Sequence, residues 1–272
     1  GGGIGMQVVD SPDDFDKALR LCQGRALSAF GDDRVFLEKF IRGAQHIEFQ
    51  VLGDGEKAIH FGERFCSIQR RHQKILEEGP WLSEDIRSEL GSRVVAGAEA
   101  VGYKGLATFE FLRDTDGEFF FLEVNPRVQV EHTVTEMISG LDLVEKQIEV
   151  AQGLPLNLEQ DDILFKGHSI ETRLYAEDPD NDFSPQTGEV VLWKEASGEG
   201  IRIDNGLFSG IHITPFYDPM IAKIISWGKN RDEARLTLVK ALLETNLFGV
   251  KTNKKFLLNI LDNNNFKKGG IT

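Results

Sequence analysis

Residues 119–132 read Phe-Phe-Phe-Leu-Glu-Val-Asn-Pro-Arg-Val-Gln-Val-Glu-His, with a polar side chain at every second position from the first glutamate onward. Alternate residues of an extended strand point to one face, so we expect that face to carry Glu123, Asn125, Arg127, Gln129 and Glu131. Burying such a row costs several kcal/mol per unpaired charge unless cations or ligands meet it. Carboxylate and amide oxygens suit Mg²⁺, and a guanidinium suits an oxyanion. The alternative is a solvated face of mixed charge.

A second carboxylate precedes this stretch. Glu110 lies in the apolar run 107–112, and Asp116-Gly117 between the two runs is a strong hairpin signal. Folding the hairpin places Glu110 close to Glu123, and two like charges there require a cation between them. The pattern predicts a divalent metal with nucleotide phosphates as further ligands. Phosphoryl transfer is then the expected reaction type.

The chain opens with a glycine cluster, Gly1-Gly2-Gly3-Ile4-Gly5-Met6. Consecutive glycines let backbone N–H groups turn toward phosphate oxygens. A terminal glycine cluster is equally typical of a linker, so the motifs that follow decide between the two.

Those motifs appear in a fixed order. After the glycines come Glu38-Lys39 between apolar pairs, then Ser67-Ile-Gln-Arg-Arg-His-Gln-Lys74, then the Glu110/Glu123 hairpin. This succession resembles the ATP-grasp core of biotin carboxylase. The stretches 167–173 and 217–220 are similar to the C-terminal domain of that family, nearest the acyl-CoA carboxylase branch.

The resemblance implies an α+β protein with an ATP-grasp core, in which an antiparallel sheet is flanked by helices beside a partial lid. The expected divisions are a lid remainder at 1–36, the core at 37–156 and a biotin carboxylase C-terminal domain of short strands and helices at 157–272. Members of the family carry an N-terminal domain before the glycine loop. We therefore expect this chain to be a fragment without it.

Local patterns predict the individual elements. We expect helices at 11–23, 83–101 and 231–244, a helical stretch at 132–152 interrupted at 139–140, a hairpin around 53–55, short strands at 167–175, 189–193, 201–204 and 221–227, and a loop at 263–265.

The resemblance also implies site residues. ATP would be bound by Gly1, Gly2, Gly3, Gly5, Met6, Glu38, Lys39, His46, Gln69 and His72. Mg²⁺ or Mn²⁺ would be held by Glu110, Glu123 and Asn125. Bicarbonate and biotin would meet Gln129, Val130, Arg127 and Arg173, and the catalytic residues would be Glu131, Arg127, Arg173 and Lys74.

Each assignment has a structural alternative. Glu38-Lys39 is compatible with an ordinary strand edge, and the run 70–74 with a solvated basic turn. His46 is compatible with a structural histidine. Arg173 could simply pair with Glu171 or Glu177.

The implied function is ATP-dependent carboxylation of biotin by bicarbonate, through carboxyphosphate. Biotin would be presented on a carrier domain, a carboxyltransferase subunit would use the product, and a homodimer is possible. Two alternatives remain: another ATP-grasp ligase of the carbamoyl-phosphate-synthase type, and a non-catalytic fragment that keeps the fold.

Composition limits the other classes. The net charge of −13 argues against binding to nucleic acid or to anionic membranes. Two cysteines without nearby histidine pairs do not indicate a zinc site, and they fit a reducing compartment such as the cytoplasm or a mitochondrial matrix. No apolar run approaches the roughly 20 residues of a membrane span.

The glycine loop departs from the family pattern at two positions. Ile4 and Gln7 stand where the family has basic residues. With these changes and without the N-terminal domain, we expect the chain alone to turn over little or no ATP, because phosphoryl transfer needs a closed, dry site.

Overall fold

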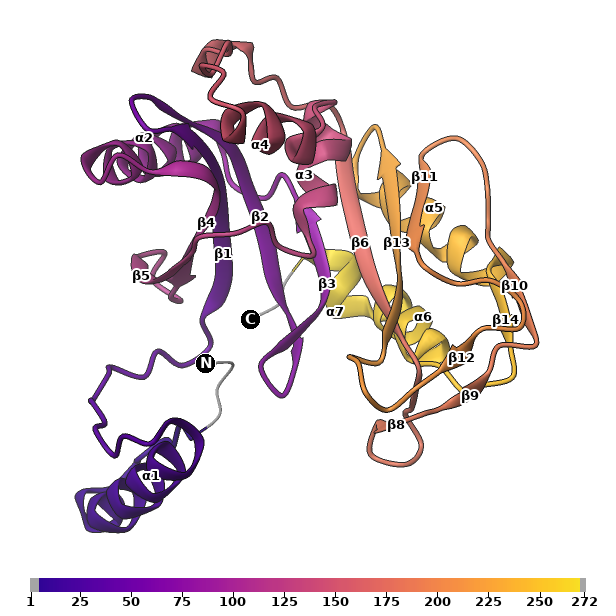
Figure 1. Ribbon diagram of the computed structural model, residues 1–272, viewed down its shortest axis with the longest axis horizontal. Coiled ribbons are helices and arrows are strands. Elements are labelled where there is room, and N and C mark those ends of the chain that lie inside the picture. Colours follow the sequence, from indigo (N-terminus) through magenta and orange to yellow (C-terminus); the bar gives the residue numbers. More distant parts are fainter. Residues whose placement is uncertain (1–4, 270–272) are drawn as a thin grey trace.

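One antiparallel sheet runs through most of the computed structural model, which describes residues 5–269 (Figure 1). Its strands are β1 (Gln45–Asp54), β2 (Ala58–Arg70), β3 (Gln73–Gly79), β4 (Lys104–Arg113), β5 (Phe119–Asn125), β6 (His168–Tyr175), β11 (Ile201–Asn205) and β13 (Met220–Gly228). Their order across the sheet is β11-β13-β6-β3-β2-β1-β4-β5. The predicted α+β class, with an antiparallel sheet and flanking helices, is confirmed.

Helices cover both faces of the first half of the sheet. The alternating Ile47, Phe49 and Val51 of β1 pack against α2 (Glu84–Ala100), whose Leu90, Val94 and Ala98 are buried. The opposite face meets α3 (His132–Ser139) and α4 (Leu143–Ala151), which end and begin around Gly140. These helices, their interruption and the β1–β2 hairpin match the sequence prediction.

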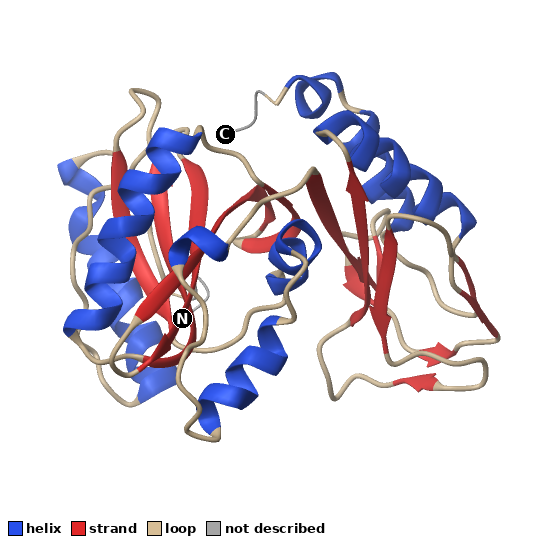
Figure 2. Cartoon of the chain, turned by 90° about the horizontal axis from the view of Figure 1, so that it is seen from above, coloured by secondary structure: helices blue, strands red, loops and turns tan. Residues whose placement is uncertain are grey.

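The second half of the sheet is covered by α5 (Arg231–Glu244), as predicted, with α6 (Lys254–Asp262) packed beside it (Figure 2). The predicted loop at 263–265 is wrong. A short helix, α7 (Asn264–Lys268), begins there, because the Asn263 side chain accepts a hydrogen bond from the Asn265 N–H at 2.8 Å and caps it.

Short strands complete this half. The single strand predicted at 189–193 is two strands with different partners: β9 (Gly188–Glu189) pairs with β12 (His212–Ile213), and β10 (Leu192–Lys194) pairs with β14 (Asn246–Phe248). A further pair joins β7 (Glu177–Asp178) to β8 (Ser184–Pro185), and a 3-10 turn, η2, spans Gln160–Asp162.

The N-terminal helix stands apart from the sheet (Figure 1). A 3-10 turn, η1 (Pro12–Asp14), is capped by Ser11 and leads into α1 (Phe15–Phe30), which continues seven residues beyond the predicted end. Gly31 ends it in the left-handed conformation, at φ 72°. No residue of α1 is buried.

The sheet is continuous across the predicted boundary at 156/157, because β3 pairs directly with β6. Helix α3 lies over this junction and contacts β2, β3, β6 and β13. The three domain limits therefore remain predictions. Within residues 5–269, none of the helices combines the length and the apolar character needed to cross a lipid bilayer.

Candidate active site

A row of charged residues crosses the sheet where β1, β2, β4 and β5 lie side by side. Glu48 of β1 is opposite Arg64 of β2 on one side and opposite Glu110 of β4 on the other. Glu110 is in turn opposite Glu123 of β5. The predicted juxtaposition of Glu110 and Glu123 is confirmed. Directly opposed residues project from the same face, so three carboxylates line up across the strands.

The predicted strand through residue 131 is wrong. β5 ends at Asn125, and residues 126–131 form an irregular loop that leads into α3. Pro126 has no N–H to donate to a sheet, which fits the end of the strand at that point. Arg127, Gln129 and Glu131 therefore do not continue the face of β5.

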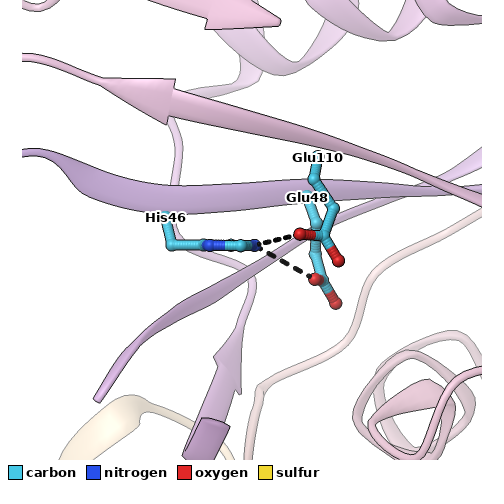
Figure 3. A group of neighbouring side chains, drawn as sticks. All are labelled: His46, Glu48 and Glu110. Atoms are coloured by element: carbon cyan, nitrogen blue, oxygen red, sulfur yellow. Dashed lines mark ion pairs between the residues drawn. The ribbon is translucent and has the colours of Figure 1, made fainter. Parts of the chain in front are cut away.

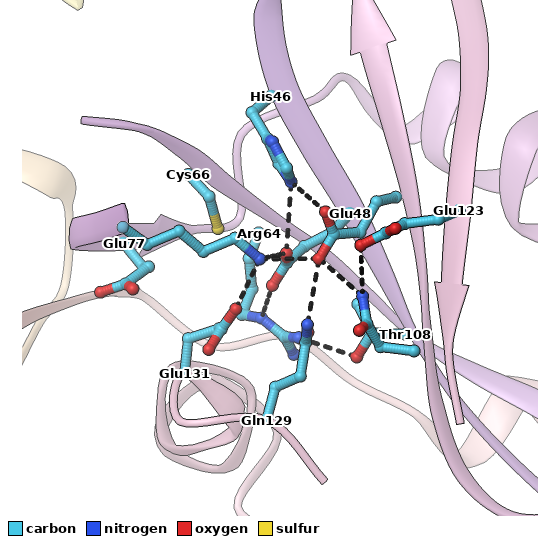
Figure 4. Close-up of polar contacts among 12 residues, drawn as sticks. His46, Glu48, Arg64, Cys66, Glu77, Thr108, Glu123, Gln129 and Glu131 are labelled. Atoms are coloured by element: carbon cyan, nitrogen blue, oxygen red, sulfur yellow. Dashed lines mark hydrogen bonds and ion pairs between the residues drawn. The ribbon is translucent and has the colours of Figure 1, made fainter. Parts of the chain in front are cut away.

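Figure 4 shows the polar contacts around Glu48 and Glu131. Lys74 of β3 contacts both of these carboxylates and that of Glu110. Its Nζ donates to Glu110 Oε1 at 2.9 Å, to Glu131 Oε1 at 2.7 Å and also to Glu48 Oε2. All four groups are nearly enclosed, and burial alone would lower the pKa of Lys74. The surrounding carboxylates outweigh burial and raise that pKa.

Glu110 collects several further donors. Its Oε1 accepts hydrogen bonds from Asn125 Nδ2 and Gln129 Nε2, both at 3.0 Å. His46 Nε2 lies 3.0 Å from Glu110 Oε2 and 3.6 Å from Glu48 Oε2 (Figure 3).

The ionised forms of this group stabilise one another. Burial opposes the charge on Glu110, but His46 and Lys74 prevail and lower its pKa to about 2. Burial likewise opposes the charge on His46, but Glu110 and Glu48 raise its pKa to about 9. The imidazole is therefore protonated near neutral pH.

Arg64 of β2, which lies beneath the carboxylates of the site, was not identified in the sequence analysis. Arg64 is fully buried and donates to Glu48 Oε1 at 2.7 Å and to Gln50 Oε1 at 2.9 Å. It also reaches the hydroxyls of Thr135 and Thr108. The sequence does carry a signal for its partners Glu48 and Gln50, because they alternate along β1 with the apolar residues that predict the strand.

Arg173 bridges the two halves of the sheet. Its Nε donates to Glu77 Oε1 at 2.7 Å and its guanidinium reaches Glu131 Oε2 at 2.9 Å. The alternative pairing with Glu171 or Glu177 is wrong. Glu177 instead accepts from Arg70 at 2.7 Å. Arg173 and Lys74 thus hold the two oxygens of Glu131.

Arg127 is exposed and differs from the other arginines of the site. It donates to Val128 O at 3.2 Å and to Asn125 Oδ1 at 3.3 Å. Within the described part of the chain, no carboxylate lies at ion-pair distance from it. Its guanidinium is available to an anion.

Only some of the residues predicted to bind the nucleotide lie near the carboxylates. Gln69 Nε2 lies 3.3 Å from His46 Nδ1, so these two are adjacent to the carboxylates. His72 is exposed in the turn between β2 and β3. Glu38 and Lys39 are exposed in a segment without regular secondary structure, where the Lys39 ammonium lies 4.7 Å from the centre of the Phe120 ring.

The glycine loop lies largely outside the described residues. Gly1, Gly2 and Gly3, together with Ile4, are not described, and nothing tests their assignment to phosphate. Gly5 and Met6 are described, with Met6 exposed. Val130 contributes its carbonyl to the site region, where it accepts from Lys223 Nζ at 2.8 Å.

The donor set fits a hard cation. Glu123 is exposed and, among the described residues, has no cation partner at ion-pair distance, while Glu110 faces it across the hairpin. Asn125 lies 3.3 Å from Glu123 Oε1 through its Nδ2. Two groupings of possible ligands, His46-Glu48-Glu110 and Glu48-Cys66-Glu131, share the fully buried Glu48, which Arg64 and Lys74 already neutralise. The facing carboxylates of Glu110 and Glu123, without Glu48, are thus the better candidates for Mg²⁺.

Family models match almost the whole chain. Residues 1–159 match "Carbamoyl-phosphate synthase L chain, ATP binding domain", and residues 171–272 match "Biotin carboxylase C-terminal domain". A biotin carboxylase from Nostoc sp. is 46% identical over 275 residues, which is all of this chain and 62% of that protein. A biotin carboxylase from Haemophilus influenzae is 44% identical over 273 residues, which is 99% of this chain and 60% of that protein.

A solved structure of a biotin carboxylase domain is also similar to this chain. The biotin carboxylase domain dimer of Hydrogenobacter thermophilus 2-oxoglutarate carboxylase, in complex with MgADP, ADP and bicarbonate, superposes with a TM-score of 0.97. It is 42% identical, covering all of this chain and 61% of that one. The chain thus spans about three fifths of the length of these proteins.

Proposed function

We propose that this chain, which belongs to the biotin carboxylase family, is part of an ATP-dependent ligase that carboxylates biotin with bicarbonate. The observation that carries the proposal is the shared contact of Lys74. One ammonium binds both Glu110, a candidate metal ligand, and Glu131, the candidate base. A site for phosphate-bound metal and a site for proton removal are therefore adjacent.

The proposed first step joins bicarbonate to phosphate. A bicarbonate oxygen attacks the γ-phosphorus of ATP, the bond to the β-phosphate oxygen breaks, and ADP leaves. Glu131, fixed by Lys74 and Arg173, takes the bicarbonate proton. Gln129 and Val130 line the bicarbonate side. When bound, Mg²⁺ or Mn²⁺ at Glu110, Glu123 and Asn125 would neutralise the phosphate oxygens.

The proposed second step transfers the carboxyl group. Carboxyphosphate breaks at its C–O bond into CO₂ and phosphate, and the phosphate takes the ureido proton of biotin. The resulting nitrogen nucleophile attacks CO₂. Arg127 stabilises the enolate form of biotin, since its guanidinium is exposed and free of carboxylates among the described residues. His46, Gln69, His72, Glu38 and Lys39 are proposed to meet the nucleotide.

The proposed partners are a carboxyltransferase subunit, which would use the product, and a biotin carrier domain. A dimer is also proposed, with support from the dimeric relative from Hydrogenobacter. The proposed compartment is reducing, cytoplasm or mitochondrial matrix, with support from the free thiols of Cys22 and Cys66.

The test is bicarbonate-dependent release of ADP in the presence of free biotin. We expect the full-length protein to release ADP only when both bicarbonate and Mg²⁺ are supplied, and the 272-residue chain alone to release little. ADP release by the full-length protein that does not depend on bicarbonate would contradict the proposal, and would favour another ATP-grasp ligase.

Replacing Arg127 with Ala should separate biotin chemistry from nucleotide binding. We expect biotin carboxylation to fall by roughly a hundredfold, as when one anion-stabilising donor is lost, while MgATP affinity changes by less than about threefold. Steady-state carboxylation and nucleotide binding by calorimetry measure the two effects. Arg93→Ala, which removes an exposed arginine paired with Glu89 on α2, is the matched control and should change neither. A loss of ATP affinity with carboxylation intact would reverse the role assigned to Arg127.

A further inference from the structure

Two buried glutamates lie beside the site without a role in the proposed steps. Glu77 of β3 and Glu171 of β6 are opposite each other in the antiparallel register, and both side chains are fully buried. Directly opposed residues in such a pair have Cβ atoms about 4.5–5.5 Å apart and share one face of the sheet. The two carboxyl groups are therefore neighbours in a region that water does not reach.

Each carboxyl group has one oxygen with a partner and one without. Glu77 Oε1 accepts from Arg173 Nε at 2.7 Å, and Glu171 Oε2 accepts from the Thr133 hydroxyl. Glu77 Oε2 and Glu171 Oε1 are buried and have no hydrogen-bond partner. A carboxylate can only accept hydrogen bonds, whereas a protonated carboxyl group can also donate one. One proton held between the pair would give a free oxygen a partner.

The charges around the pair do not neutralise it. The charged and titratable groups that face it are Arg173, Tyr175, Lys74, Lys223, Glu131 and Cys66. Among the described residues, Arg173 is the only cation at ion-pair distance from either carboxylate, and Glu131 shares it. Burial raises the pKa of both glutamates, and the charge of Glu77 raises that of Glu171 further.

We propose that Glu77 and Glu171 share a single proton, and that the singly protonated pair positions Arg173 against Glu131. With the proton in place the pair carries one negative charge, so the guanidinium divides between Glu77 and Glu131. When the proton leaves, a second charge draws the guanidinium toward the pair and weakens its contact with Glu131. The sharing of the proton stands without the proposed function, while its effect on Glu131 rests on it.

Stability measured against pH tests the shared proton. A raised pKa in the folded state means that the folded protein binds more protons than the unfolded chain above the ordinary glutamate pKa of 4.5. The free energy of unfolding should then fall as pH rises, with the unfolding constant increasing up to about tenfold per pH unit. Glu171→Gln removes this proton. We expect the variant to gain stability relative to the wild type between about pH 5.5 and about pH 8.

Glu78→Gln is the matched control. Glu78 lies next to Glu77 on β3 and is equally buried, but Arg231 and His168 bind it at 2.6 Å and 2.8 Å. Burial opposes its charge, yet these partners lower its pKa. Because its pKa is lowered, Glu78 is ionised in both the folded and the unfolded chain above pH 4.5, so Glu78→Gln should be less stable than the wild type by a constant amount across the same interval. A gain that grows with pH in Glu171→Gln, beside a flat difference in Glu78→Gln, supports the proposal, and a flat difference in both variants overturns it.

Infrared spectroscopy gives a second measurement on the folded chain. The wild type should show the carbonyl stretch of a protonated carboxyl group near neutral pH. Glu171→Gln should lack it, because Glu77 then keeps its ion pair with Arg173 and has no opposed carboxylate with which to share a proton. Absence of the band in the wild type, or its persistence in Glu171→Gln, would overturn proton sharing. Neither measurement depends on catalysis.

The positioning of Arg173 is tested in the full-length protein. Glutamine mimics a permanently protonated carboxyl group, so Glu171→Gln should shift the alkaline limb of bicarbonate-dependent ADP release to higher pH. An unshifted limb would overturn the positioning role. If the wild type releases no ADP at all, the proposed function fails, while stability and infrared results still decide the shared proton.

Discussion

Replacing Glu123 with Gln is expected to lower bicarbonate-dependent ADP release by roughly a hundredfold or more, because one charge of a metal clamp is worth several kcal/mol of barrier. Glu123 is exposed at the edge strand β5, and no cation of the described residues lies at ion-pair distance. The fold therefore does not depend on its charge. Denaturant unfolding of the variant should match the wild type while turnover collapses.

Glu110→Gln should show the same loss of turnover together with a loss of stability. Glu110 binds Lys74, Asn125 and Gln129 through one oxygen and faces His46 with the other. Its removal disturbs buried partners as well as the metal. Glu123→Gln is thus the cleaner of the two tests.

The matched control for both variants is Glu118→Gln. Glu118 is exposed in the turn of the same hairpin, where only its backbone bonds to Asp114. It should behave as the wild type in ADP release and in Mn²⁺ dependence. Near-normal ADP release by Glu123→Gln would remove Glu123 from the metal site.

The hairpin around Glu110 and Glu123 could be predicted because its information is local. An Asp-Gly turn between two alternating runs fixes both the turn and the register. The same alternation beyond Pro126 was misleading. Alternation of polar and apolar residues is typical of a strand, but a strand also needs a neighbouring strand to accept hydrogen bonds from its N–H groups. Residues 126–131 belong to no strand of the sheet.

The inner half of the site could not be predicted in this way. Glu48, Arg64 and Glu77 become site residues only when β1 pairs with β4 and when β3 pairs with β6. The latter pair joins residues about 90 positions apart in the chain. Neither pairing follows from turn chemistry. The resemblance supplied the outer residues and left these buried partners unassigned.

Lys74→Met is expected to cause the largest loss of stability among single substitutions at this site. It removes the ammonium that Glu48, Glu110 and Glu131 share, while all three carboxylates stay buried. Breaking a buried charge pair typically costs about 3–5 kcal/mol, because the remaining charge is uncompensated. His46, Arg64 and Arg173 still offset part of the charge, so we expect the lower end of that range in denaturant unfolding.

The pH dependence of this loss has a definite sign. In the wild type the pKa of Glu110 is lowered to about 2, so its ionised form stabilises the fold above the ordinary pKa of 4.5 and that contribution is lost as pH falls toward 2. Without Lys74 less of this contribution exists. The deficit of Lys74→Met relative to the wild type should therefore be largest near neutral pH and should shrink as the medium becomes acidic.

A double variant tests whether charge or packing is responsible. Adding Glu48→Gln to Lys74→Met removes one of the uncompensated charges, and it should recover a measurable part of the lost free energy of unfolding. Lys146→Met is the matched control, since Lys146 pairs with Glu149 on the surface of α4, where such a pair contributes less than about 1 kcal/mol. If Lys74→Met cost no more than Lys146→Met, or if the double variant recovered nothing, the ammonium would not be what holds these carboxylates together. Recovery of stability in the double variant, with turnover still absent, would separate the structural role of Lys74 from its catalytic role. Stability requires only that the buried charges balance, whereas the proposed chemistry requires this ammonium between Glu110 and Glu131.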